Sequence, residues 1–123
     1  MNRLQRDDGV TLAYRVHNPQ APSVPLLLTH GFGATAGMWD RNIDALSVDR
    51  PVIVWDQRGH GSSDAPDDMD RYSEQIGVAD MAAILDAAGV DRAILGGMSL
   101  GGYLSLAFHL AHPQRVGEVE GQG

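Results

Sequence analysis

Apolar side chains occur along this chain in short continuous runs rather than in strict alternation. Residues 24–29, 51–56 and 93–98 form three such runs, and a segment with helical spacing separates each run from the next. Continuous apolar runs are typical of strands that are covered on both faces. Strands that alternate with helices favour parallel pairing through right-handed crossovers. The pattern therefore predicts an α/β protein with a doubly wound, mostly parallel sheet.

Three segments between and after these runs predict helices. Residues 39–46 place apolar side chains on one face of a predicted helix of about three turns. Ser73 is suited to begin a second helix as its N-cap, and Gly89 is suited to end it. A third helix is expected over residues 100–112, because the proline that follows cannot continue it.

The two ends of the chain differ from this pattern. Residues 4–17 alternate loosely around an Asp8-Gly9 turn signal, which predicts an antiparallel hairpin at a sheet edge. Residues 117–123 are rich in Gly and Glu where the fold would place its next apolar strand, so we expect a disordered tail there. The prediction is one core domain over residues 1–116, with about five strands and three helices, followed by that tail.

Composition and charge narrow the function classes. The chain has 123 residues, of which 43% are hydrophobic and 20% charged, as in an ordinary soluble domain. A formal net charge of -7 argues against nucleic acid or an anionic membrane as partner. Because the chain contains no cysteine, neither disulfides nor thiolate metal sites are possible. No cluster of His, Asp and Glu has the spacing of metal ligands. No secretory signal is evident, so we expect a cytoplasmic protein. The lack of ligand spacing leads us to expect no metal.

The strongest chemical signal is the run Gly97-Met98-Ser99-Leu100-Gly101, which joins the third apolar run to the last predicted helix. Glycine at both ends permits a sharp bend, which holds the serine hydroxyl at the carboxyl edge of the sheet. The helix that begins at Leu100 offers free N–H groups where an oxyanion would form. Those are the requirements of acyl transfer, and because this serine chemistry needs no cofactor, we expect none. Taken alone, the same run would also suit a tight packing turn between strand and helix.

Two glycine-rich loops follow the first and second apolar runs. They are HGFG at residues 30–33 and DQRGHGSS at residues 56–63. Together with the serine bend, in this order along the chain, they resemble the α/β-hydrolase family over residues 4–116, the N-terminal half of that fold. The loop residues expected to organise the turns are His30, Gly31, Gly33, Asp56, Arg58, Gly59, His60, Gly61 and Ser63.

The resemblance implies specific roles at the serine bend. Ser99 would be the nucleophile, and the backbone amides of Phe32 and Leu100 would form the oxyanion hole. The strand that ends at His30 would lie beside the strand that ends at Met98, which brings the Phe32 loop to the serine. Relatives that open epoxides or displace halide carry a carboxylate at the nucleophile position. Serine therefore favours a small-molecule ester, lactone, thioester or C–C substrate, and perhydrolases and haloperoxidases share this serine version.

A catalytic serine also needs a base and a carboxylate that orients it. In the family these follow the nucleophile in the order acid, then histidine. After Ser99 this chain offers only His109, His112, Glu118 and Glu120, which are too close in sequence to reach the expected positions. We therefore expect the chain to be nearly inactive by itself. We also expect the last strand to be an open edge and apolar helix surface to be uncovered, which favours self-association.

Two other interpretations remain open from the sequence. Residues 31–36 match G-x-G-x-x-A after a strand, and Asp56 ends the next strand roughly where a ribose-binding acid belongs, as in a dinucleotide-binding half-domain. Alternatively, the chain is a non-catalytic pseudo-hydrolase fragment that keeps the first half of the fold.

Overall fold

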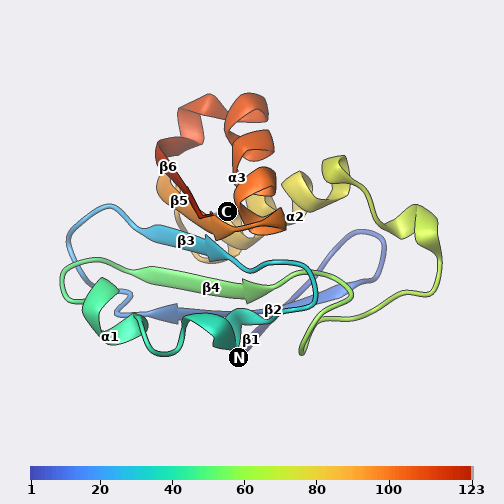
Figure 1. Cartoon of the computed structure of the whole chain (residues 1–123), viewed down its shortest axis with the longest axis horizontal. Helices are drawn as coiled ribbons and strands as arrows, with labels where there is room; N and C mark the ends of the chain where they lie inside the picture. Colours follow the sequence, from blue (N-terminus) through green and yellow to red (C-terminus); the bar gives the residue numbers. More distant parts are fainter. Residues whose placement is uncertain (123) are drawn as a thin grey trace.

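Six strands form one mixed sheet in the order β1-β2-β4-β3-β5-β6 (Figure 1). The computed structural model describes residues 1–122, and for residues 118–122 it describes the backbone alone. The strands are β1 (Asn2–Gln5), β2 (Thr11–His17), β3 (Leu26–Thr29), β4 (Val52–Asp56), β5 (Ala93–Met98) and β6 (Val116–Gln122). The pairs β3–β4, β3–β5 and β5–β6 are parallel, whereas β1–β2 and β2–β4 are antiparallel. The predicted fold class and the three central strands are thus confirmed.

The N-terminal hairpin lies at one edge of the sheet, as predicted. Gly9 adopts φ +89°, and the turn closes with a hydrogen bond of 2.7 Å from the Arg6 N–H to the Val10 carbonyl. A positive φ is readily adopted only by glycine, which explains the turn at this position. The hairpin presents Leu12 and Tyr14 of β2 to the core.

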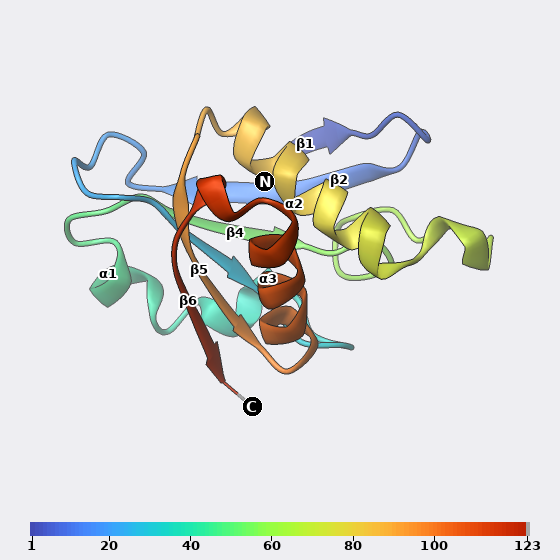
Figure 2. The same ribbon diagram turned by 90° about the horizontal axis from the view of Figure 1, so that it is seen from above.

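Two helices cover one face of the sheet (Figure 2). Helix α2 (Glu74–Ala87) begins where the Ser73 hydroxyl accepts a hydrogen bond from the Ile76 N–H, and Gly89 follows it at φ +72°. Helix α3 (Leu100–Ala111) ends before the proline, as expected. Side chains from both helices pack with the strands in the larger core cluster, which includes Trp55 and Phe108. Burial of that apolar surface is the main stabilising contribution to this layer.

The opposite face carries two short helices where one longer helix was predicted. A 3-10 helix, η1 (Ala36–Trp39), and α1 (Ile43–Leu46) are separated by three polar residues. The Ala36 N–H donates to the Asp56 carboxylate, which fixes the start of η1 from a distant part of the chain. The predicted apolar face is still used, since Ile43 packs with Val52 and Val54 of β4 in the second core cluster. The prediction of a single helix of about three turns was wrong.

The segment expected to be a disordered tail instead pairs with the sheet. Strand β6 lies parallel to β5 from Ala93↔Val116 to Met98↔Gln122, with a register shift after the first pair. Consequently β5 is not an open edge, and β6 is the edge opposite β1. Parallel pairing satisfies the main-chain groups of β5 whatever side chains the next segment carries. An argument from apolar side chains alone therefore could not find this strand, and residue 123 of the expected tail lies outside the described residues.

The outer surface of α3 exposes large apolar side chains. Leu106 is 54% exposed and Leu110 is 82% exposed. Within residues 1–122, no helix is long and apolar enough to cross a membrane. Self-association through such surface stays a prediction. Size-exclusion chromatography should show a dimer or larger species that Leu106→Ser with Leu110→Ser reduces, and a monodisperse wild-type monomer would contradict it.

Candidate active site at the carboxyl edge of the sheet

Ser99 stands at the bend between β5 and α3 in a strained backbone conformation. Its φ of 54° and ψ of -115° are unusual for a residue with a side chain, and among the described non-glycine residues only Asn18 shares the positive φ. Such a conformation costs about 1–3 kcal/mol and persists only where the surroundings impose it. The Ser99 side chain is exposed to solvent. The bend therefore holds a hydroxyl outward at the carboxyl edge of the sheet.

The glycines on either side of Ser99 make this bend possible. A Cβ atom at Gly97 would lie 2.6 Å from the Gly102 nitrogen, which is backbone and cannot move aside. A Cβ atom at Gly101 would lie 2.6 Å from the His30 carbonyl oxygen and would also collide with the Thr29 carbonyl. Strand β3 and the first turn of α3 thus approach too closely for any side chain.

The loop after β3 lies directly against the serine bend. Thr29 is in register with Gly97, as expected for neighbouring strands. A Cβ atom at Gly31 would lie 3.3 Å from the Met98 carbonyl oxygen and 3.7 Å from the Ser99 Cβ atom. The resemblance predicted that the strand ending at His30 lies beside the strand ending at Met98, and the register shows that it does.

Two backbone amides at this edge have no acceptor in the part of the chain that the structure describes. Among the described residues, the Phe32 N–H donates no hydrogen bond, and the Phe32 side chain is 83% exposed. Leu100 is the first residue of α3, so its N–H has no carbonyl one turn earlier in the helix. Both amides belong to segments that flank Ser99. An oxyanion hole needs free donors of this kind.

His30 braces the loop rather than facing the serine. Its Nε2 accepts a hydrogen bond of 3.0 Å from the Gln57 N–H, and its Nδ1 lies 2.7 Å from the Gly31 carbonyl oxygen. The side-chain amide of Gln57 in turn donates a hydrogen bond of 2.8 Å to the His30 carbonyl oxygen. This pattern fits a neutral ring with its proton on Nδ1. The ring is fully buried, and burial lowers the pKa of His30 below 6.5.

This buried ring predicts a pH dependence of stability. In the unfolded chain His30 binds a proton as the pH falls below about 6.5, whereas in the folded chain its lowered pKa resists protonation. The stabilisation from the neutral ring is therefore complete above that pH and is lost as the pH falls through the region below it. Urea denaturation at pH 7.5 and 5.5 should show a decline for wild type that His30→Gln reduces. An equal decline in both chains would contradict this.

Asp56 is fully engaged within the loops. Its Oδ1 accepts from the Ala36 N–H at 2.7 Å, and its Oδ2 accepts from the Ser62 N–H at 2.9 Å. The Ser63 hydroxyl donates to the Asp56 carbonyl at 2.6 Å. Gly61, at φ +50°, leaves room for this carboxylate, because a Cβ atom there would collide with it. A buried carboxylate with both oxygens paired is not available to a ribose hydroxyl, so the dinucleotide interpretation loses its acid.

His60 holds the loop that carries Phe32. Its Nε2 accepts a hydrogen bond of 2.9 Å from the Gly33 N–H, and Gly33 adopts φ +78°. The rings of His60 and Phe32 meet edge to face, with centroids 5.6 Å apart. Gly59, at φ +84°, brings its backbone against the Tyr72 ring. The two glycine-rich loops therefore support each other beside the serine bend.

Arg58 is the centre of a buried charge network that sequence reasoning missed. Its guanidinium donates two hydrogen bonds to Asp80 of α2, at 2.8 and 3.0 Å, and one of 2.8 Å to Asp8. Another hydrogen bond of 2.8 Å reaches the Arg71 carbonyl. Burial opposes the Arg58 charge, but the paired carboxylates outweigh it and raise its pKa. The available signal was an aspartate among the apolar residues of the α2 sequence.

The described residues do not supply an activating base to the serine. Within residues 1–117, whose side chains the structure describes, none forms a hydrogen bond with the Ser99 hydroxyl. His109 lies near the end of α3 and His112 just after it, whereas Ser99 precedes its first residue. The described residues therefore provide a hydroxyl and two free amides but no base that contacts the hydroxyl.

Comparison with known proteins identifies the family. A sequence model described as alpha/beta hydrolase fold matches residues 24–119. The chain belongs to the alpha/beta hydrolase fold family. In this family member the match includes both glycine-rich loops and the serine bend. A dinucleotide-binding half-domain is therefore not needed to explain the G-x-G-x-x-A match at residues 31–36.

Three similar proteins illustrate the range of this alpha/beta hydrolase family. The 1-acylglycerol-3-phosphate O-acyltransferase ABHD5 of Rattus norvegicus is 38% identical over 120 residues, which are 95% of this chain and 34% of that protein. The structure of Est816, an N-acyl homoserine lactone degrading enzyme, has 36% identity and a TM-score of 0.84, covering 94% of this chain and 42% of Est816. The structure of epoxide hydrolase A of Mycobacterium thermoresistibile has 29% identity and a TM-score of 0.85, covering 98% of this chain and 38% of that protein. The chain thus spans between 34% and 42% of the length of these proteins.

Proposed function

We propose that Ser99 is the nucleophile of a serine hydrolase that cleaves an ester, lactone or related acyl bond of a small molecule. The observation that carries this proposal is the strained, exposed Ser99 at a strand-to-helix bend, flanked by the free amides of Phe32 and Leu100. A packing turn has no need of a positive φ at a serine, because glycine would adopt it without strain. Strain of this kind is concentrated at functional sites.

The chemistry follows from these groups. The Ser99 oxygen attacks the acyl carbonyl carbon as a base removes the hydroxyl proton, and the carbonyl oxygen becomes negatively charged. The Phe32 and Leu100 amides donate hydrogen bonds to that oxygen, and the positive end of the α3 dipole adds to them. Collapse of the intermediate expels the leaving group with a proton and leaves an acyl-serine, which water then hydrolyses.

The residue at the bend favours acyl transfer over epoxide opening. Similar proteins include an O-acyltransferase, a lactone degrading enzyme and an epoxide hydrolase. The pattern with a carboxylate at the nucleophile position belongs to the epoxide-opening relatives, whereas this chain has serine there. A hydroxyl nucleophile and an oxyanion hole suit a carbonyl substrate, which develops negative charge on oxygen.

The base and its orienting carboxylate would come from polypeptide beyond the described residues. Without them, turnover is expected to fall by a factor of about 10⁴ or more, with a remnant from the oxyanion hole. The 123-residue chain should therefore hydrolyse p-nitrophenyl acetate barely faster than its Ser99→Ala variant. Saturable turnover that Ser99→Ala abolishes would contradict this expectation.

A covalent probe tests the nucleophile itself. Prolonged exposure to a fluorophosphonate should give one adduct by intact mass, and peptide mapping should locate it at Ser99. Ser99→Ala should remain unmodified, whereas Ser62→Ala, which removes an exposed loop serine, should react as wild type does. Adducts spread over surface serines, or an undiminished adduct in Ser99→Ala, would refute the proposed nucleophile and leave a non-catalytic role.

A further inference from the structure

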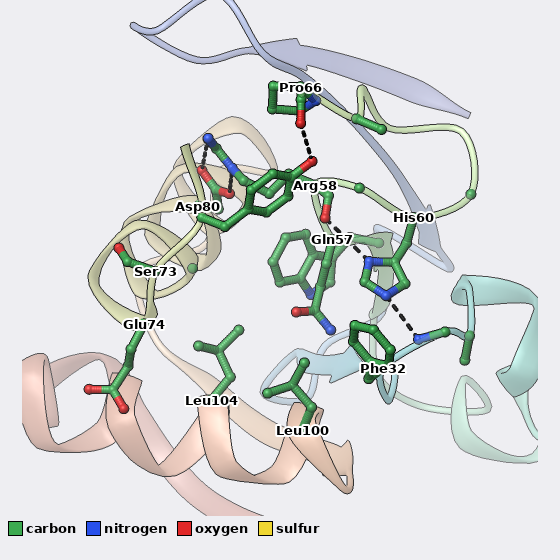
Figure 3. Close-up of a pocket in the computed structure, with 18 of the residues that line it drawn as sticks. Phe32, Gln57, Arg58, His60, Pro66, Ser73, Glu74, Asp80, Leu100 and Leu104 are labelled. Atoms are coloured by element: carbon green, nitrogen blue, oxygen red, sulfur yellow. Dashed lines mark hydrogen bonds and ion pairs between the residues drawn. The ribbon is translucent and has the colours of Figure 1, made fainter. Parts of the chain in front are cut away.

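A cavity of about 900 Å³ opens beside the serine bend, between the start of α3, the start of α2 and the loop after β4 (Figure 3). Phe32 and Leu100, whose amides are the proposed oxyanion donors, both line it. Ligand pockets are typically about 300–1,000 Å³, so its size suits a small organic molecule. The cavity therefore begins where the reacting carbonyl would sit.

The side chains that point into the cavity are largely apolar. Leu100 and Leu104 project into it from α3, and Phe32 lies close to Leu100 (Figure 3). Trp55 of β4 is buried behind the cavity, and its indole N–H is engaged with the Thr29 hydroxyl at 3.0 Å. Gly77 of α2 contributes no side chain. Contact with an apolar ligand would bury these surfaces and release water from them, which lowers the free energy of the complex.

Two polar side chains of the wall, Arg58 and Tyr72, already have protein partners. The Arg58 guanidinium is held by Asp80 and Asp8, so its charge is not free for a ligand. The Tyr72 hydroxyl donates to the Pro66 carbonyl at 2.8 Å. Paired groups of this kind offer little to a charged ligand, whose burial without a partner is costly.

The rim of the cavity is acidic. Asp67 and Glu74 line it and are exposed, and the chain carries a net charge of -7. A carboxylate inside the cavity would lose hydration and meet charge of its own sign. The acidic rim therefore disfavours an anionic ligand part, and the paired wall groups give no buried counter-ion to a ligand of either charge.

The acyl group fits this cavity better than the leaving group. The leaving group takes its proton from the catalytic base, which is proposed to lie beyond the described residues, so it should face that polypeptide and not this cavity. The imidazole that lines the cavity, His60, is no substitute, because its Nε2 is engaged with the Gly33 N–H and its Nδ1 lies near the Arg58 carbonyl oxygen. The carbonyl held by the Phe32 and Leu100 amides would carry its chain into the space that their side chains line.

We propose that this cavity binds the uncharged, apolar acyl chain of the substrate, an assignment that rests on the proposed serine hydrolase. The enzyme would therefore prefer medium-chain acyl groups to acetyl groups and would reject acyl groups that carry a carboxylate at the far end.

Binding to the inactive Ser99→Ala chain tests the cavity without any turnover. The probes are N-methyloctanamide, N-methylacetamide and the mono-N-methylamide of suberic acid, which places a carboxylate at the end of a chain of similar length. Saturable changes in ¹H–¹⁵N spectra should appear at Gly77, Leu100 and Leu104 and spare Leu110. The octanamide should bind at least about 10-fold more tightly than either of the other two probes, since each buried methylene contributes.

A substitution that reduces the cavity volume can be compared with a matched substitution outside the cavity. Gly77→Leu should weaken N-methyloctanamide binding by about 10-fold or more, because a Cβ atom there would lie 2.9 Å from the Leu104 Cδ1 atom and the larger side chain must displace Leu104 within the cavity wall. Val48→Leu places the same side chain at an exposed position outside the cavity and should bind as the parent does. If Gly77→Leu fails to fold by circular dichroism, Leu100→Trp fills the same space from α3.

The outcomes separate this inference from the proposed function. Chain-length-dependent binding that Gly77→Leu abolishes would support the cavity even if the fluorophosphonate failed to label Ser99. Labelling of Ser99 together with equal binding of all three probes, or with shifts centred on Leu110, would overturn the acyl-chain assignment and leave the nucleophile in place.

Discussion

Replacing Gly101 with alanine is expected to lower the free energy of unfolding by about 3 kcal/mol, because the new methyl group has no space. It would collide with the Thr29 carbonyl and lie 2.6 Å from the His30 carbonyl oxygen. Both atoms are backbone at the end of β3, so relief requires a shift of the strand against α3. The same shift would move the Phe32 loop from Ser99. Urea denaturation followed by circular dichroism measures the change.

Gly117→Ala is the matched control for this experiment. A Cβ atom at Gly117 would find its nearest neighbour, the Ala93 carbonyl oxygen, at 3.7 Å, an ordinary contact distance. Its effect should stay within about 0.5 kcal/mol. Similar losses from the two substitutions would show that the approach of β3 to α3 is not what constrains residue 101.

Asp80→Ala is expected to destabilise the fold by about 3–5 kcal/mol, the range for breaking a buried ion pair. The Asp80 carboxylate is 1% exposed and holds both Arg58 and Arg6. Its loss would leave the Arg58 guanidinium buried with only the partly exposed Asp8 as counter-ion. Arg58 joins the loop after β4 to α2, so that loop should also lose order.

Two further variants distinguish charge pairing from packing at this site. Asp86→Ala removes an exposed partner of Arg115 and should cost less than about 1 kcal/mol. Arg58→Met combined with Asp80→Leu should recover much of the stability lost in Asp80→Ala, because the buried Arg58 charge is removed and Arg6 and Asp8, which each lose a partner, are partly exposed. A double variant no more stable than Asp80→Ala would contradict the charge argument.

The parts of the fold that the sequence predicted correctly are those with local signals. The apolar runs of β3, β4 and β5 and the Ser73 cap of α2 depend on residues close together in the chain. The bend at Ser99 is a similar case, since both of its glycines lie within two residues of it. Such signals survive without knowledge of the tertiary contacts.

The parts that the sequence did not predict depend on contacts between distant residues. The start of η1 is fixed by Asp56, 20 residues further along the chain. The partner of Arg58 on α2 lies 22 residues away, and Asp8 lies 50 residues away. Strand β6 forms through main-chain pairing with β5, which leaves no apolar pattern to detect. Tertiary context therefore decided the outcome at each of these positions.

The most direct test of the serine site is the ¹H–¹⁵N spectrum of the chain after fluorophosphonate labelling. If Ser99 faces an oxyanion hole, a phosphonyl oxygen of the adduct accepts hydrogen bonds from Phe32 and Leu100. The amide protons of those two residues should then move downfield further than any others, while the Gly9 amide in the hairpin stays unchanged. An adduct at Ser99 that leaves the Phe32 and Leu100 amides unmoved would contradict the account.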